Sequence, residues 1–149
     1  MQYYFAYGSN MNQSQMKKRC PDSRLLGRVV LHEHKIDFTI YSSKRLCGCA
    51  DVVETPGGKV WGLLYEIGVA DLESLDRIEG HPVNYQRCSV DVVDDCGTKH
   101  TALTYKVVTK HPSTLKTSKH YLTLLQDSAK ANNFPEEYQR LLSTFATLD

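Results

Sequence analysis

Apolar and polar positions form short strand-like blocks along most of the 149-residue chain, and long apolar stripes are confined to its end. Residues 2–7 are rich in aromatic side chains and predict a short buried strand. Residues 59–67 are apolar on both faces, which is typical of a strand in the middle of a core. Two or three further strands are expected between residues 24 and 53, and the Pro-Gly-Gly sequence at 56–58 predicts a turn.

Helical patterns occupy three places. Asn12 can cap a helix that runs to about Arg19, and residues 71–79 predict a second helix that ends at Gly80. The C-terminal part carries two apolar stripes at helical spacing, and Pro135 suits the first turn of the last helix. The members of the stripes are Tyr121, Leu122, Leu125 and Ala129, then Phe134, Tyr138, Leu141, Leu142 and Phe145.

Residues 85–94 and 99–108 predict a β-hairpin around a turn at 94–97. Strands therefore outnumber helices, and the two kinds do not alternate regularly. This order favours an α+β fold with a mixed or antiparallel sheet that can close into a barrel. The length fits a single domain that spans residues 1–149.

Charge is nearly balanced, because 18 Lys and Arg face 17 Asp and Glu. Nucleic-acid-binding domains normally carry a marked basic excess, so no nucleic-acid partner is expected. No apolar run approaches the ~20 residues that span a bilayer, and the N-terminus lacks a signal-peptide pattern. An odd count of five cysteines then favours free thiols in a reducing, cytoplasmic setting.

Two short clusters carry metal-ligating residue types. Cys47 and Cys49 lie on the same face of an expected strand, without a second Cys/His pair at zinc spacing. The His-Glu-His sequence at 32–34 has no third ligand placed by spacing and is expected to meet solvent and neighbouring strands. We expect buried thiols and no metal or other cofactor.

The Tyr-Gly-Ser-Asn sequence at 7–10 is the first candidate site. Gly8 lets a ligand approach the backbone, and successive N–H groups in such a turn can hold an anion at the start of the following helix. An ordinary strand-to-helix turn, with Ser9 or Asn10 in a capping role, explains the same residues.

Glu79 is the second candidate. When this helix is counted from residue 69, Val69, Leu72, Leu75 and Ile78 define an apolar face, and Glu79 falls close to its centre. Glu73, Ser74 and Arg77 are expected in solvent. Burial and the negative end of the helix dipole both raise the pKa of such a carboxyl toward the range used in acid–base catalysis. Two alternatives stay open: the helix frays at Gly80, or Glu79 pairs with a nearby cation.

Several segments together resemble the γ-glutamylcyclotransferases and their AIG2-like relatives. Residues 4–11, YFAYGSNM, resemble the N-terminal signature of that family, and residues 75–80, LDRIEG, followed by Tyr85 resemble the segment with its catalytic glutamate. Weaker resemblances extend over the whole chain. They lie at residues 35–38, 56–62, 118–121 and 132–138.

The resemblance implies a small mixed β-barrel flanked by helices and a site that needs no cofactor. It assigns the catalytic role to Glu79, the residue that the helix geometry had already singled out. It assigns pocket-wall roles to Tyr85 and Tyr121. The anion-holding loop corresponds to Tyr4, Tyr7, Gly8, Ser9 and Asn10.

The implied reaction is an intramolecular aminolysis that converts a γ-glutamyl compound to 5-oxoproline and a free amine. The leaving group is open: it is an amino acid, or a larger amine if the chain is a γ-glutamylamine cyclotransferase. A non-catalytic protein that binds small molecules on the same fold is the third alternative. The expected partner is a small γ-glutamyl substrate, with neither nucleic acid nor membrane, and the expected state is a monomer or homodimer.

Overall fold

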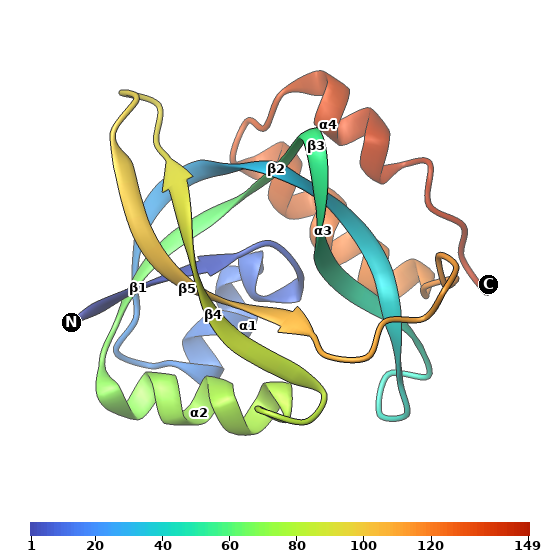
Figure 1. Ribbon diagram of the computed structural model, residues 1–149, viewed down its shortest axis with the longest axis horizontal. Helices are drawn as coiled ribbons and strands as arrows, with labels where there is room; N and C mark the ends of the chain where they lie inside the picture. The colour runs from blue at the N-terminus through green and yellow to red at the C-terminus, as the bar shows by residue number, and fades with distance from the viewer.

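The computed structural model describes residues 1–149 and contains a closed five-stranded barrel with the strand order β1-β3-β2-β4-β5 (Figure 1). Four helices flank the barrel, which confirms the predicted α+β class and the small mixed barrel. The strands are β1 (Gln2–Ala6), β2 (Arg24–Ser42), β3 (Cys47–Ile67), β4 (Tyr85–Val93) and β5 (Lys99–Val107). The helices are α1 (Gln13–Arg19), α2 (Val69–Glu79), α3 (Lys119–Ala131) and α4 (Glu136–Leu142).

The strand pairing is antiparallel everywhere except at the seam. β1 runs antiparallel to β3, with Ala6 opposite Leu63, and meets β5 in parallel, with Tyr4 opposite Leu103. β2 and β3 form a long hairpin, and a shorter hairpin of β4 and β5 joins it at β2. β1 therefore fills the gap between the two hairpins, and the chain that leaves it forms a short turn and then α1.

The region from 24 to 58 agrees with the sequence prediction except at its end. Residues 24–53 contain two strands, β2 and the first part of β3, as predicted, but the Pro-Gly-Gly sequence does not reverse the chain. Residues 55–58 instead bulge out of β3 opposite Glu33, and pairing resumes on both sides. The Gly57 N–H donates to the Glu33 carboxylate at 2.9 Å, and Glu33 itself has a positive φ of 62°. These residues are typical of a turn, but because β2 pairs with β3 on both sides of them they form a bulge within β3.

Helix ends follow their capping residues. The Asn12 side chain accepts from the Gln15 N–H at 2.8 Å and starts α1, as predicted. α2 begins two residues earlier than predicted, at Val69, and ends where Gly80 takes the left-handed conformation with φ 68°. The predicted apolar stripe of α3 is buried throughout, whereas Leu141 of the last helix is 40% exposed.

In Figure 1, α2 lies along one end of the barrel and the C-terminal pair α3 and α4 packs beside the β2–β3 hairpin. The fully buried core includes Phe5, Phe38, Leu63 and Leu125, from strands and a flanking helix. None of the helices is long and apolar enough to cross a membrane.

Candidate active site

A single cavity of about 630 Å³ opens at the end of β1. It lies among β1, the turn that follows, the ends of α1 and α2, the turn between β2 and β3, and α3. Every residue that the sequence nominated lines this cavity. They are Tyr4, Tyr7, Gly8, Ser9, Asn10, Glu79, Tyr85 and Tyr121.

The turn after β1 is folded back on itself. Met11 N–H donates to Gly8 O at 3.0 Å and Asn12 N–H donates to Ser9 O at 3.0 Å. The Gly8 N–H has no acceptor in the protein. A Cβ at Gly8 would lie 3.3 Å from the Tyr121 hydroxyl, a tight contact. The turn thus packs closely against Tyr121 and has a free N–H donor, and that it binds an anion stays a prediction.

The Asn10 side chain is almost fully buried and links three elements. Its amide nitrogen donates to the Tyr4 hydroxyl at 3.0 Å, and its oxygen accepts from Arg19 at 2.9 Å and from Gln15 at 3.0 Å. Gln15 also donates to Ser9 Oγ at 2.8 Å. Gln15 and Arg19 are four residues apart and so share one face of α1. The helix therefore clamps the turn that it follows.

Tyr85 and Tyr121 meet at one peptide position of β3. The Tyr85 hydroxyl donates to Ala50 O at 2.7 Å, and the Tyr121 hydroxyl accepts from Ala50 N–H at 3.1 Å. Of these two hydroxyls, that of Tyr121 can still donate its proton to an acceptor in the cavity, whereas that of Tyr85 already donates to Ala50 O. Burial raises the pKa of both hydroxyls, so both remain neutral.

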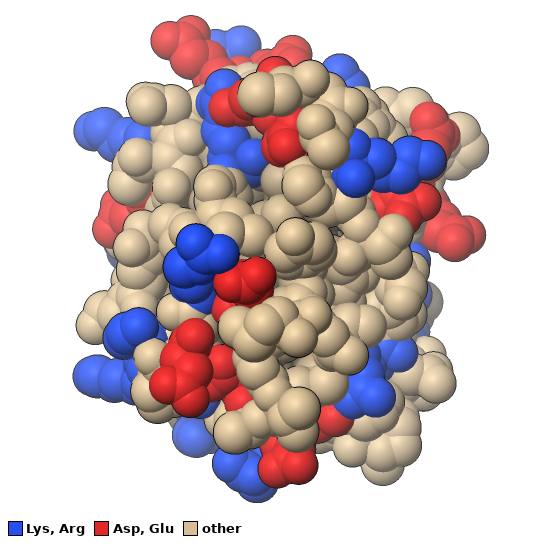
Figure 2. Space-filling view, turned by 90° about the vertical axis from the view of Figure 1, so that its left-hand side faces the viewer, with Lys and Arg blue, Asp and Glu red and all other residues tan.

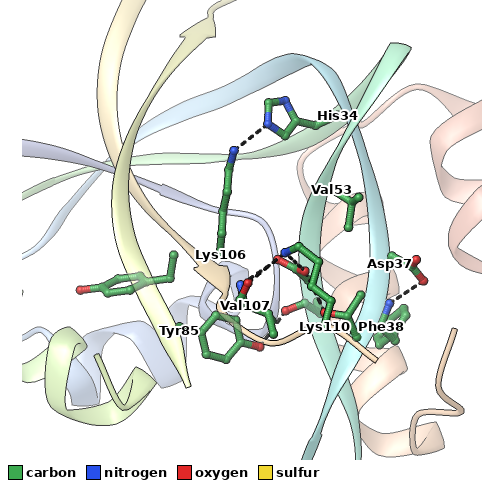
Figure 3. A network of polar contacts seen from close by, with 12 residues as sticks. His34, Asp37, Phe38, Val53, Tyr85, Lys106, Val107 and Lys110 are labelled. Atoms are coloured by element: carbon green, nitrogen blue, oxygen red, sulfur yellow. Dashed lines mark hydrogen bonds and ion pairs between the residues drawn. The ribbon is translucent and has the colours of Figure 1, made fainter. Parts of the chain in front are cut away.

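The next residue of β3, Asp51, is fully buried and has three donors. Thr39 Oγ1 donates at 2.8 Å, Val107 N–H at 3.0 Å and Lys110 Nζ at 2.6 Å. Figure 3 shows Lys110 and Val107 close together above Tyr85, and both donate to the Asp51 carboxylate. The network joins the end of β5 to β2 and β3 directly behind Ala50, and so supports the peptide that both tyrosines contact.

Glu79 is the last residue of α2 and lies one turn after the fully buried Leu75. The helix does not fray before it, because Gly80 N–H closes the last turn on Arg77 O at 3.2 Å. Glu79 forms no ion pair with any cation of the protein. Neither open alternative is therefore observed, and a partly buried carboxyl group faces the cavity.

The predicted faces of α2 need correction in part. Val69 and Ile78 are 78% and 42% exposed, and only Leu72 and Leu75 of the expected stripe are covered. Ser74, expected in solvent, donates its hydroxyl to Arg19 O at 2.8 Å. The buried face is narrower than a full stripe because α2 contacts only the end of the barrel, and α1 covers one of its flanks.

Burial raises the pKa of the Glu79 carboxyl to about 7, while the Arg19 and Arg45 guanidiniums oppose that rise. Near neutral pH the group therefore exists in both protonation states. A carboxyl with these properties can take a proton in one step and return it in the next.

Arg19, Arg45 and Tyr105 are among the cavity residues that sequence reasoning did not nominate. The Tyr105 hydroxyl donates to Asp76 at 2.7 Å, and Asp76 also forms an ion pair with Arg87. These contacts hold the Tyr105 ring in place. Arg19 ends a helix with three basic residues and looked like an ordinary complement to the helix dipole. Arg45 lies in a connection whose conformation no local pattern reveals.

The metal-type clusters have ordinary environments. Cys47 and Cys49 are buried free thiols, and the other three cysteines are also unpaired. Burial raises the pKa of Cys49 to about 12, so this thiol of the cavity wall remains protonated. His34 is buried, and its Nε2 lies 2.9 Å from Lys106 Nζ on β5. No group of three His, Cys, Asp or Glu is placed to hold a metal ion.

A small barrel with a cavity that is lined by an unpaired carboxyl and by a turn with a free N–H defines a class: enzymes that act on small molecules. Comparison with known proteins specifies the family. The AIG2-like family model matches residues 59–142. A γ-glutamylcyclotransferase of Bos taurus is 31% identical, over 98% of this chain and 79% of its own length. The Homo sapiens γ-glutamylcyclotransferase is 30% identical over the same shares.

Solved structures agree with these relatives. A structure described as a γ-glutamyl cyclotransferase superposes with a TM-score of 0.91 at 28% identity, over 99% of this chain and 89% of its own. YkqA of Bacillus subtilis has a TM-score of 0.78 at 28% identity, over 97% of this chain and 55% of its own. The chain therefore belongs to the AIG2-like family, which includes the γ-glutamylcyclotransferases.

Proposed function

We propose that this protein converts γ-glutamyl compounds to 5-oxoproline and a free amine, with Glu79 as the proton-transfer group. The observation that carries the proposal is the Glu79 carboxyl, which has no ion-pair partner, faces the cavity and has a pKa of about 7. Structural carboxylates inside proteins are normally paired, as Asp51 is. An unpaired one at a cavity is the expected position of a general base.

The reaction needs no water, electron or cofactor. The α-amine of the γ-glutamyl group attacks its own γ-carbonyl carbon, a C–N bond forms, and the C–N bond to the leaving amine breaks. At pH 7 the amine is an ammonium, so a base must remove a proton before attack. Glu79 accepts protons from the attacking nitrogen and returns them to the departing nitrogen, which balances the reaction. Acid–base catalysis of this kind supplies about 10²–10⁴-fold.

The rest of the cavity orients the substrate. The free N–H of Gly8 and the turn around it are suited to the α-carboxylate or to the oxyanion that develops on the γ-carbonyl. The neutral hydroxyl of Tyr121 lies beside this turn and can donate a hydrogen bond to the substrate. Because attack occurs within one molecule, holding the glutamyl chain in its folded shape is the main contribution of these walls.

The expected partners follow from this assignment. A small γ-glutamyl compound is the ligand, and on the face shown in Figure 2 positive and negative side chains are interspersed, without the large basic patch that nucleic acid requires. We keep the expectation of a monomer or homodimer in the cytoplasm, with its thiols reduced.

Release of 5-oxoproline from a panel of γ-glutamyl compounds tests the proposal. We expect turnover by the wild-type protein without added metal. Two alternatives give other outcomes. Activity only on large γ-glutamylamines would identify a γ-glutamylamine cyclotransferase. If γ-glutamyl compounds stabilise the protein against heat but no 5-oxoproline is released, the protein is a non-catalytic binding protein.

A further inference from the structure

The turn between β2 and β3, residues 43–46, directs one side chain into the cavity. Ser42 begins the turn: its carbonyl accepts from Leu46 N–H at 2.7 Å, and its hydroxyl accepts from Arg45 N–H at 3.0 Å. Leu46 has a φ of 59°, a left-handed conformation that is uncommon for a non-glycine residue and is often found at functional sites. Leu46 points into solvent and is 65% exposed, whereas Arg45 is half-buried.

Arg45 is held in place by neutral groups alone. One guanidinium nitrogen donates to Gln15 Oε1 at 3.1 Å and lies 3.4 Å from Ser9 Oγ, and the guanidinium carbon lies 5.0 Å from the centre of the Tyr121 ring. These contacts use one end of the guanidinium and orient it. Its remaining N–H donors have no acceptor within the protein.

No carboxylate of the protein neutralises Arg45. The six ion pairs of the molecule involve other cations. Glu79 feels the charge of Arg45 without a direct contact. An oriented, half-buried guanidinium with free donors at a cavity wall is the arrangement that proteins use to bind a carboxylate of a ligand.

We propose that Arg45 is a specificity-determining residue that binds the carboxylate of the leaving group. The proposal rests on the proposed function and adds to it a residue that distinguishes leaving groups: those with a carboxylate should be favoured over simple amines. Arg45 enters from the rim, where its neighbours Tyr41 and Leu46 are more than half exposed. We expect the departing group on this open side, from which it can leave, and the glutamyl part between Glu79 and the turn at Gly8, which also line the cavity.

The test compares two substrates, γ-glutamyl-alanine and γ-glutamyl-ethylamine, which differ only in the carboxylate of the leaving group. We expect the wild-type protein to favour γ-glutamyl-alanine in kcat/KM by at least about tenfold, the effect of a charge-assisted hydrogen bond. Arg45→Gln should lower kcat/KM for γ-glutamyl-alanine by about the same factor, mainly through KM. Because Arg45 also lowers the pKa of Glu79, both substrates are compared at about pH 9, where Glu79 is ionised in both proteins. There kcat/KM for γ-glutamyl-ethylamine should fall much less than kcat/KM for γ-glutamyl-alanine.

Two control variants separate recognition from structure. Arg45→Lys keeps the charge but loses the planar pair of donors, so it should restore part of the preference. Lys35→Gln removes a positive charge from an exposed position of β2 outside the cavity and should leave both substrates unaffected.

Each outcome has one meaning. If Arg45→Gln lowers both activities equally, Arg45 supports the turn at Ser9 and does not read the leaving group. If the wild-type protein uses both substrates equally well, no carboxylate is recognised, and the assignment is wrong while the cyclotransferase function stands. If the wild-type protein releases 5-oxoproline only from large γ-glutamylamines, the role of Arg45 fails while the cyclotransferase function stands. If it releases 5-oxoproline from no member of the γ-glutamyl panel, the proposed function itself fails, and the role of Arg45 fails with it.

Discussion

Asp51 and Glu79 are carboxylates that line or adjoin the same cavity and have opposite surroundings. Asp51 lies within the barrel wall and accepts from a hydroxyl, a backbone N–H and the Lys110 ammonium. Glu79 lies at the end of a helix, has no ion-pair partner, and feels its cations only at a distance. Asp51 thus gains from folding, whereas Glu79 loses hydration without compensation. The difference separates a carboxylate that stabilises the fold from one whose burial costs stability, as the proposed role of Glu79 requires.

Removing the stabilising member should have the largest effect. Asp51→Ala leaves the buried Val107 N–H and Thr39 hydroxyl without their acceptor. The Lys110 ammonium is 37% exposed and can return to water, which limits the loss. We expect the free energy of unfolding to fall by about 3 kcal/mol, measured by urea denaturation. Asp22→Ala, at an exposed position, is the control and should cost less than about 0.5 kcal/mol. Equal effects would show that the Asp51 network stabilises nothing.

Removing the reactive member should affect rate instead. Glu79→Gln keeps shape and hydrogen-bonding capacity but cannot accept a proton, so 5-oxoproline release should fall at least ~10²-fold while the substrate still binds. Glu73→Gln, on the same helix and exposed to solvent, should leave the rate nearly unchanged. If Glu79→Gln turns over like the wild-type protein, another residue is the base. If both variants lose activity equally, the assignment of Glu79 to the cavity and Glu73 to solvent is contradicted.

The pH dependence of the rate tests the environment of Glu79 directly. The group must ionise before it accepts a proton, so kcat/KM should rise with pH through an apparent pKa near 7. Below that value the rate should fall about tenfold per pH unit. If kcat/KM instead rises through an apparent pKa at or below about 4.3, the pKa of free Glu, the carboxyl is solvated or paired.

The smallest effect is that of Glu79→Gln on the free energy of unfolding, and its size depends on pH. Glu79 has a higher pKa folded than unfolded, so the folded state is penalised when the group ionises. The penalty is absent below the unfolded pKa of about 4.3, grows as pH rises, and is complete above about 7. Glu79→Gln removes it, so the variant should be more stable by roughly 2 kcal/mol at pH 8 and equal to wild type at pH 4. Thermal or urea unfolding at both pH values measures this, and a gain at pH 4 would contradict it.

Local signals predicted the parts of the site that depend on local structure. Glu79 could be found because it lies four residues after Leu75 on one helix face, and Gly80 marks the helix end. The Tyr-Gly-Ser-Asn turn could be found because it interrupts an aromatic strand. Membership in a recognisable family then connected the two, which no periodicity does.

Features set by partners distant in sequence could not be predicted. The Pro-Gly-Gly sequence at 56–58 forms a bulge because β2 pairs on both sides of it. Val69 and Ile78 are exposed because α2 meets only the end of the barrel. Arg45 enters the cavity because of the left-handed conformation of Leu46, and its neutral partners come from another part of the chain.

The parallel seam between β1 and β5 bears on the order in which the protein is made. β1 is synthesised before both of its partners: its antiparallel partner ends at Ile67 and its parallel partner begins at Lys99. At about 5–20 residues per second, the first strand waits several seconds or more on the ribosome for both neighbours. Closing so long a loop carries an entropic cost before the contacts form. The aromatic strand with the substrate-facing turn therefore completes the barrel late, and a nascent chain halted before β5 has no assembled cavity.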